Sequence, residues 1–360
     1  MAGLSGYPAT LSSPARGGGL SHTRTTLPTV FLCLASPIIV EVLFGSTTVS
    51  IIDSLLFEIP FYGGAAVLIR EVVRRRALGW TSLLLLGIAF AIFEEFLVIQ
   101  TSISPVLFAQ GGSTFVYGRF FGVDWVYALW AVGYESVWAV VLPIYATELV
   151  FPDSKEQPWL SNRGIITVGL LFGLGTLGSW AIYTRVVTPA VIGHVYAPSP
   201  LIVAGAVTAV VACIVVGLIR WPSWPRPVTR GITALSPWSV GALMLVVSAS
   251  WFSLVAFAFD SLPTVPPVAV VALGIALAAM AAIVVGWSST RADWSDRDRL
   301  AIVVAGLLAS MILGFWASGI TGWVNVGAKI VFDGLAGVCL IVLGRKVWMP
   351  GPATGLRHGA

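Results

Sequence analysis

The sequence predicts an all-α, polytopic integral membrane protein with about ten transmembrane helices and both termini in the cytoplasm. Three observations point to this class. Hydrophobic residues make up 57% of the 360 residues and charged residues only 10%, whereas soluble domains carry about 25% charged residues. The apolar residues form runs of about 20 residues, the length that crosses a bilayer as a helix. The basic residues gather in every second loop between these runs.

The apolar runs divide the chain into one transmembrane domain, residues 27–346, and two tails. Residues 1–26 are rich in Gly, Ser, Thr and Pro, a composition typical of a disordered tail. Residues 347–360 form a second, cytoplasmic tail. Prolines interrupt the first two runs and end most of the others. The ten expected helices are 27–46, 54–72, 79–101, 125–150, 164–184, 200–219, 237–259, 266–287, 300–318 and 326–344.

The charge distribution predicts the orientation. All but three of the 20 basic residues fall on one side of the expected membrane; the exceptions are Arg119, Arg185 and Lys329. Loops rich in Arg and Lys stay in the cytoplasm. The net charge of +4 therefore comes from basic residues in the cytoplasmic loops and tails, and we expect no nucleic-acid partner. An Arg-rich, Ala/Gly/Val-rich composition favours the plasma membrane of a bacterium.

The two halves of the domain differ in polarity. The helices of residues 200–346 are almost free of ionisable residues and are expected to be scaffold, whereas residues 27–184 form the polar, functional half. A charge inside a bilayer costs a few kcal/mol and marks function when it faces the protein interior. The candidate intramembrane site consists of five carboxylates in the outer half of the membrane: Glu41, Glu58, Glu94, Glu95 and Glu135.

Local spacing predicts how the adjacent glutamates point. Gly87, Ala91 and Glu94 share one helix face, and small residues allow a neighbouring helix to approach closely. Adjacent residues lie about 100° apart around a helix. We therefore expect Glu94 to face the interior, and Glu95 to turn toward a neighbouring helix and find a hydroxyl, amide or basic partner.

Other charged residues have local explanations. Arg70, Arg119 and Arg185 are possible charge partners of the carboxylates. Glu71 is expected to pair with the arginines three and four residues further on, Arg74 and Arg75. Lys329 and Asp333, four residues apart, are expected to neutralise one another.

The sequence predicts neither a metal site nor a cofactor. The three cysteines show no CxxC spacing, and no histidine lies inside an expected span. A metal site needs three or four converging ligands. Motifs for nucleotide binding or for a serine nucleophile are also absent.

Three segments resemble an uncharacterised family of bacterial polytopic membrane proteins. They are residues 36–46 (SPIIVEVLFGS), 68–71 (LIRE) and 93–96 (FEEF). The resemblance covers residues 36–160 and implies a multi-pass membrane fold. It implies no activity.

The pair Glu94-Glu95 also resembles the paired glutamates of CAAX-type intramembrane proteases. In that family an arginine follows on the same helix, where this chain has Ile99. The family also uses two helix-borne histidines, which the spans of this chain lack. The resemblance is therefore restricted to the glutamate pair.

We expect the protein to be a carrier for a cation or small polar solute that uses the intramembrane carboxylates. One alternative is a membrane-embedded enzyme acting on a lipid or polyprenyl substrate. The other is a non-catalytic membrane subunit, in which the acids only join helices. The lipid bilayer is the one partner that the composition requires.

Overall fold

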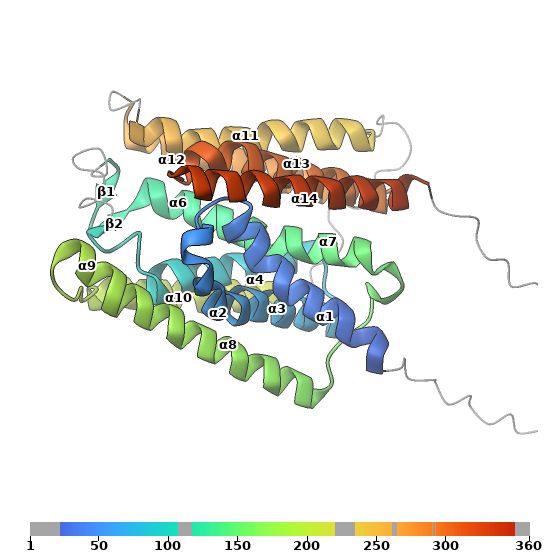
Figure 1. Ribbon diagram of the computed structural model, residues 1–360, viewed down its shortest axis with the longest axis horizontal. Coiled ribbons are helices and arrows are strands. Elements are labelled where there is room, and N and C mark those ends of the chain that lie inside the picture. The colour runs from blue at the N-terminus through green and yellow to red at the C-terminus, as the bar shows by residue number, and fades with distance from the viewer. Residues whose placement is uncertain are drawn as a thin grey trace, which may run out of the picture.

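The protein is a bundle of long helices that run along a common axis (Figure 1). The computed structural model describes residues 22–106, 117–219, 235–260, 265–289, 291 and 293–349. Within these residues the only strands form one two-residue antiparallel pair, β1 (Arg119–Phe120) and β2 (Val123–Asp124). The all-α class is confirmed.

The first half of the chain alternates α-helices with π-helical and 3-10 segments, both labelled η. Its helical elements are α1 (His22–Pro37), η1 (Ile38–Val42), η2 (Val49–Ser54), α2 (Leu55–Glu58), η3 (Ile59–Gly63), α3 (Gly64–Arg75), α4 (Trp80–Phe93), η4 (Glu94–Val98), α6 (Trp125–Tyr134), η6 (Glu135–Val141), α7 (Leu142–Val150), η7 (Pro152–Ser154), α8 (Asn162–Ile182), η8 (Tyr183–Val187) and α9 (Thr188–Ile192).

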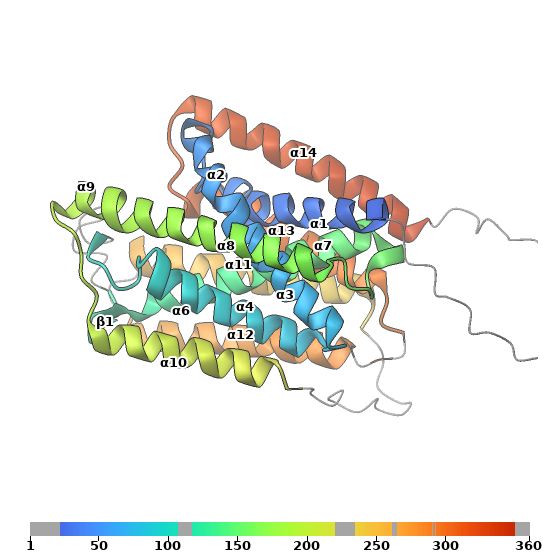
Figure 2. The ribbon, with the colours of Figure 1, turned by 90° about the horizontal axis from the view of Figure 1, so that it is seen from below.

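The second half consists of uninterrupted α-helices. In Figure 2, α10 and α14 lie at opposite edges of the bundle, with the helices of the polar half between them. The five helices are α10 (Pro200–Gly217), α11 (Pro237–Asp260), α12 (Pro267–Ser289), α13 (Asp296–Ala317) and α14 (Trp323–Trp348).

Nine helical stretches in the described residues are long and apolar enough to cross a membrane, and a shorter apolar helix covers Thr26–Val42. These ten stretches lie where the apolar runs predict them. α1 begins and α14 ends at the same end of the bundle (Figure 1), as an even number of crossings requires. α1 already begins at His22, within the segment expected to be a tail; residues 1–21 and 350–360 lie outside the described residues.

Labelling of introduced cysteines tests the orientation. Asp153, exposed in η7, is expected in the cytoplasm, and His194, exposed after α9, outside the cell. In a variant whose native Cys33, Cys213 and Cys339 are replaced by serine, His194→Cys should react with an impermeant thiol reagent in intact cells. Asp153→Cys should react only after permeabilisation. The reverse pattern would contradict the orientation.

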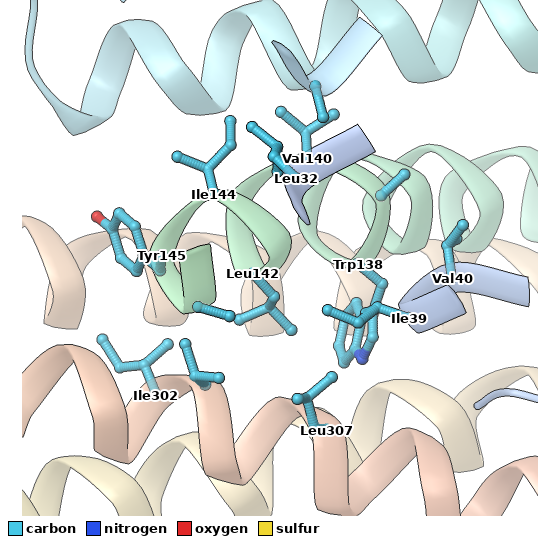
Figure 3. Packing of buried hydrophobic residues seen from close by; sticks show 14 of the residues in the cluster. Leu32, Ile39, Val40, Trp138, Val140, Leu142, Ile144, Tyr145, Ile302 and Leu307 are labelled. Carbon is cyan, nitrogen blue, oxygen red and sulfur yellow. The ribbon is translucent and has the colours of Figure 1, made fainter. Parts of the chain in front are cut away.

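The core is built around the continuous helix of η6 and α7. In Figure 3 this helix crosses the centre of the view, with Leu32 of α1 above it and Ile302 and Leu307 of α13 below it. Val140 and Ile144 pack toward Leu32 of α1, and all three are buried. The indole N–H of Trp138 donates to the carbonyl of Gly306 at 3.0 Å. The two halves of the chain therefore share one hydrophobic core.

A proline and a glycine determine how α1 meets η3. Pro37 has no N–H to donate to the carbonyl of Cys33, one helical turn earlier. Gly63 packs against this carbonyl so closely that a Cβ atom would lie 2.0 Å from its oxygen. Only glycine fits this approach, which brings η3 directly against α1.

Candidate functional site

A tyrosine joins two of the predicted carboxylates inside the bundle. The hydroxyl of Tyr62 lies 2.8 Å from Oε1 of Glu41 and 2.6 Å from Oε1 of Glu94. These three residues come from three different spans. Glu94 is 0% exposed and Tyr62 5%, so neither group exchanges freely with solvent.

The two contacts of Tyr62 require a proton between the carboxylates. A phenol has one O–H to donate, while its oxygen can also accept. When Tyr62 donates to one carboxylate, the second contact becomes a hydrogen bond only if the other carboxyl is protonated and donates to the phenol oxygen. Two ionised carboxylates that both contact the same phenol oxygen would also repel strongly in a low dielectric. The geometry therefore suits Glu41 and Glu94 sharing one proton through Tyr62.

Glu135 extends this arrangement into η6. Its carboxyl interacts with those of Glu94 and Glu41, and it is 8% exposed. Oε2 of Glu94 and Oε2 of Glu135 have no hydrogen-bond partner within the described part of the chain. Buried carboxyl oxygens without partners are costly, and they mark a place where a proton or a ligand can bind.

The outer end of the arrangement reaches the protein surface. Ser46, exposed in the loop after η1, donates its hydroxyl to Oε2 of Glu41. Thr47 donates to Oε1 of Glu58 at 2.8 Å. A chain of contacts thus runs from the surface into the bundle, and we call it the carboxyl relay: Ser46, Glu41, Tyr62, Glu94 and Glu135.

Breaks in helical regularity coincide with the relay. Five π-helical segments occur in the described residues, and four of them contain a relay residue. Such segments are rare and frequent at functional sites. They hold Glu41 in η1, Tyr62 in η3, Glu94 in η4, Glu135 in η6 and Tyr183 in η8.

The direction of Glu94 follows from the small residues on its helix face. A Cβ atom on Gly87 would lie 2.9 Å from the carbonyl oxygen of Ser136 in η6, and Ala91 is 0% exposed. α4 therefore packs directly on η6, and Glu94 continues this face toward Glu135. The expectation that Gly87 and Ala91 face another helix is confirmed.

Glu95 makes its hydrogen bond outside the relay, although its charge acts on Glu94 and Glu135. Its Oε1 accepts from the backbone amide of Ser102, in the turn after η4, and the residue is 1% exposed. The partner is an amide, as expected, but it lies in the following loop and not on a neighbouring helix. The carboxylate stabilises the end of its own span.

A match to a known family supports the membrane assignment. A model of a family described as an uncharacterized membrane protein family matches residues 30–355. The chain belongs to this family. Comparison with curated proteins found no match, and comparison with solved structures found none.

In this family member, Arg70 lies away from the carboxyl relay. Its Nε is 3.2 Å from Glu148, and it donates to the carbonyls of Ser154, Lys155 and Gln157. Its guanidinium also stacks on the ring of Trp159 at 3.4 Å. The side chain is 1% exposed, and it anchors the loop between α7 and α8.

The two outer arginines also lie apart from the relay. Arg119 donates to the carbonyl of Ile103 at 2.7 Å and, through β1, lies opposite Asp124. Arg185 is exposed, with its guanidinium 5.2 Å from the ring centre of Trp180. No arginine–carboxylate ion pair is formed by the relay residues in the described part of the chain.

Of the three ion pairs expected from spacing along one helix, two are formed. Glu71 pairs with Arg75 at 2.7 Å, and Lys329 with Asp333 at 2.9 Å. Arg74 instead binds Glu148 on α7 at 2.5 Å. The expected Glu71–Arg74 pair is replaced because Glu148, together with Arg70, forms a buried network between helices.

Sequence reasoning missed the tyrosines around the carboxylates. The hydroxyl of Tyr134 donates to the carbonyl of Val40, the residue before Glu41, at 2.5 Å. Tyr62 follows Glu58 by four residues, so the shared helix face could have indicated it. Tyr134 carries no such signal.

The described residues contain no group of three or more His, Cys, Asp or Glu side chains that could hold a metal ion. In the relay, the Tyr62 hydroxyl lies between the carboxyls of Glu41 and Glu94. This arrangement suits the binding and transfer of protons.

Asp124, outside the spans, makes stability depend on pH. Burial raises the pKa of Asp124 to about 6 from 3.8, although the Tyr127 amide and Arg119 oppose the rise. The folded protein thus holds a proton that the unfolded chain releases, and stability should increase as pH falls from about 6 to 3.8. Asp124→Asn keeps the helix cap of α6 but not the titration.

Thermal unfolding across this pH range checks the prediction. The Asp124→Asn variant should show a flatter stability curve than the parent. Asp153→Asn, at an exposed position, is the control and should follow the parent. A parent-like curve for Asp124→Asn would show that another group titrates.

Proposed function

We propose that the protein is a proton-coupled carrier of a cation or small polar solute, and that the carboxyl relay holds and transfers the coupling proton. The observation that supports this most is the hydrogen-bonded path from the exposed Ser46 through Glu41 and Tyr62 to the buried Glu94, whose charge interacts with that of Glu135. Chains of intramembrane acids are characteristic of proton relays in pumps and transporters.

Protonation of the relay changes its charge inside the membrane. With one proton fewer, Glu41, Glu94 and Glu135 gain a negative charge in a low-dielectric interior, where an unpaired charge is expensive. A cation or a solute with hydrogen-bond donors then compensates that charge. Proton release and solute binding are thereby coupled at one place.

The buried state of Glu94 fits a closed conformation of such a carrier. A carrier exposes its site to one side at a time and closes it in between. The π-helical segments that hold the relay provide adjustable positions. We propose that rearrangement of η1 and η4 opens the relay to the outside and to the cytoplasm in turn.

The position of the acids argues against an enzyme acting on a lipid. A large apolar cavity lies between α4, α7 and α11 to α13, but none of the five predicted carboxylates lines it. A lipid chain in that cavity would not meet Glu94, Glu95 or Glu135. Of the carrier and the lipid-modifying enzyme, the carrier is the function that the relay supports.

Flux measurements in liposomes test the proposal. Purified protein is reconstituted with a pH-sensitive dye inside, and a panel of monovalent cations, amines and neutral polar solutes is added outside. We expect at least one solute to drive proton movement that protein-free liposomes do not show. Absence of solute-dependent proton movement across the panel, at neutral and acidic pH, would contradict the proposal and favour a non-catalytic subunit.

A further inference from the structure

Among the described residues, an apolar cavity of about 480 Å³ opens to one side of the bundle, where Ile275 and Ala278 of its wall are exposed. Its walls come from α4, the α6–η6–α7 helix, α11, α12 and α13, all of which are spans. The volume lies in the range of ligand sites, about 300–1,000 Å³. Because the lining is almost wholly apolar, ordered water is not expected to fill it. The occupant must come from the lipid phase.

The cavity is long and has small residues along one wall. On α12 it extends from Ile275 to Val285, about 15 Å at 1.5 Å per residue. Ala278 and Ala282 lie between these residues on the same helix face and leave the space open. An extended hydrocarbon chain has this shape, whereas a compact solute does not.

One end of the cavity lies beside positive charge. Tyr145 and Ile302 line this end, and both are seen in Figure 3 on the neighbouring helices α7 and α13. The guanidinium of Arg299, one turn before Ile302, lies 5.8 Å from the ring centre of Tyr145. Its side chain is 21% exposed.

Two acidic residues lie near Arg299, and each has another partner. Asp296 is shared between Lys155, at 2.9 Å, and Arg299, at 3.5 Å. Asp298 is used to cap the start of α13 through Ser295. Lys155 is the nearer partner of Asp296, so within the described residues the guanidinium of Arg299 keeps only the longer contact with this carboxylate.

We propose that this cavity is a binding site for an anionic phospholipid of the cytoplasmic leaflet. One acyl chain occupies the space along Ala278 and Ala282, and the phosphate lies near Arg299. Basic residues at this membrane surface attract anionic lipids, and the apolar walls hold the chain. The inference does not depend on the proposed transport activity.

Native mass spectrometry tests the site. The full-length protein is reconstituted in nanodiscs with equal amounts of phosphatidylglycerol and phosphatidylcholine, and the lipid retained on release is identified. We expect one retained phospholipid, with about a fivefold preference for phosphatidylglycerol, the factor expected of one Arg contact. Retention of no lipid, of a free fatty acid or isoprenoid, or of both phospholipids equally would overturn the proposal.

Variants distinguish binding of the acyl chain from recognition of the headgroup. Ala278→Phe fills the cavity and should abolish retention, while Ala276→Phe, on the same helix but outside the lining, should not. Arg299→Gln should keep a lipid but lose the preference, and Arg163→Gln, exposed at the start of α8, should retain it. If Ala278→Phe does not fold, Ala282→Phe replaces it. Parent-like retention by a folded filling variant would overturn the site.

Discussion

Glu94→Gln is expected to abolish proton-coupled flux while the protein still folds and inserts. The amide keeps the size of the side chain and an oxygen that can accept from Tyr62, which lies 2.6 Å from Oε1 of Glu94. It cannot gain or lose a proton, so the relay is interrupted at its most buried member. A positioned proton-transfer group contributes about 10²-fold or more to a rate, and we expect a decrease of that order in the liposome assay.

The adjacent glutamate is the matched control. Glu95→Gln makes the same chemical change one residue further on, but Glu95 accepts from the Ser102 amide and lies outside the relay. We expect its flux to stay close to that of the parent. Any effect of the substitution should appear as lower thermal stability. Equal losses of flux in the two variants would show that both acids are structural, and unchanged flux in Glu94→Gln would exclude the relay.

Glu148→Gln is expected to destabilise the protein by about 3 kcal/mol, the cost of removing one partner from a buried ion pair. Glu148 is 2% exposed and binds two arginines, Arg70 at 3.2 Å and Arg74 at 2.5 Å. The variant leaves Arg70, itself 1% exposed, without its anion. Unfolding in detergent, followed by a spectroscopic signal against temperature or denaturant, measures the loss.

A second acid near Arg74 shows whether burial of the ion pair causes the loss of stability. Glu156 lies 3.7 Å from Arg74 but is 65% exposed. Exposed ion pairs contribute about 1 kcal/mol or less, so Glu156→Gln should unfold close to the parent. If both variants lose the same stability, the Arg70–Glu148 network is not the buried anchor of the α7–α8 loop that its geometry indicates.

The sequence by itself determined the class and the spans of this protein. A bilayer requires about 20 apolar residues per crossing and internal backbone hydrogen bonding throughout. Composition and run length therefore predicted the ten apolar helices closely. Spacing along a single helix was equally informative, because the pairs Glu71–Arg75 and Lys329–Asp333 depend on one helical turn.

The list of candidate acids could also be read from the sequence, but their division into roles could not. Intramembrane carboxylates stand out in an apolar chain, and the Gly87–Ala91 face indicated the direction of Glu94. Nothing in the sequence showed that Tyr62 would join Glu41 to Glu94. Gly63, the residue after Tyr62, packs closely on the Cys33 carbonyl of α1, a contact between spans that no local pattern predicts.

Only the tertiary structure decided which polar residues meet between helices. Arg70 and Glu148 are 78 residues apart in the chain, and no local pattern predicted their pairing. Helices in a membrane are apolar on nearly every side, since lipid and core are equally apolar. Their sequences consequently carry little information about rotation around the helix axis. This rotation, together with the π-helical shifts at Glu41, Glu94 and Glu135, determines which acids meet inside the bundle and which hold a loop.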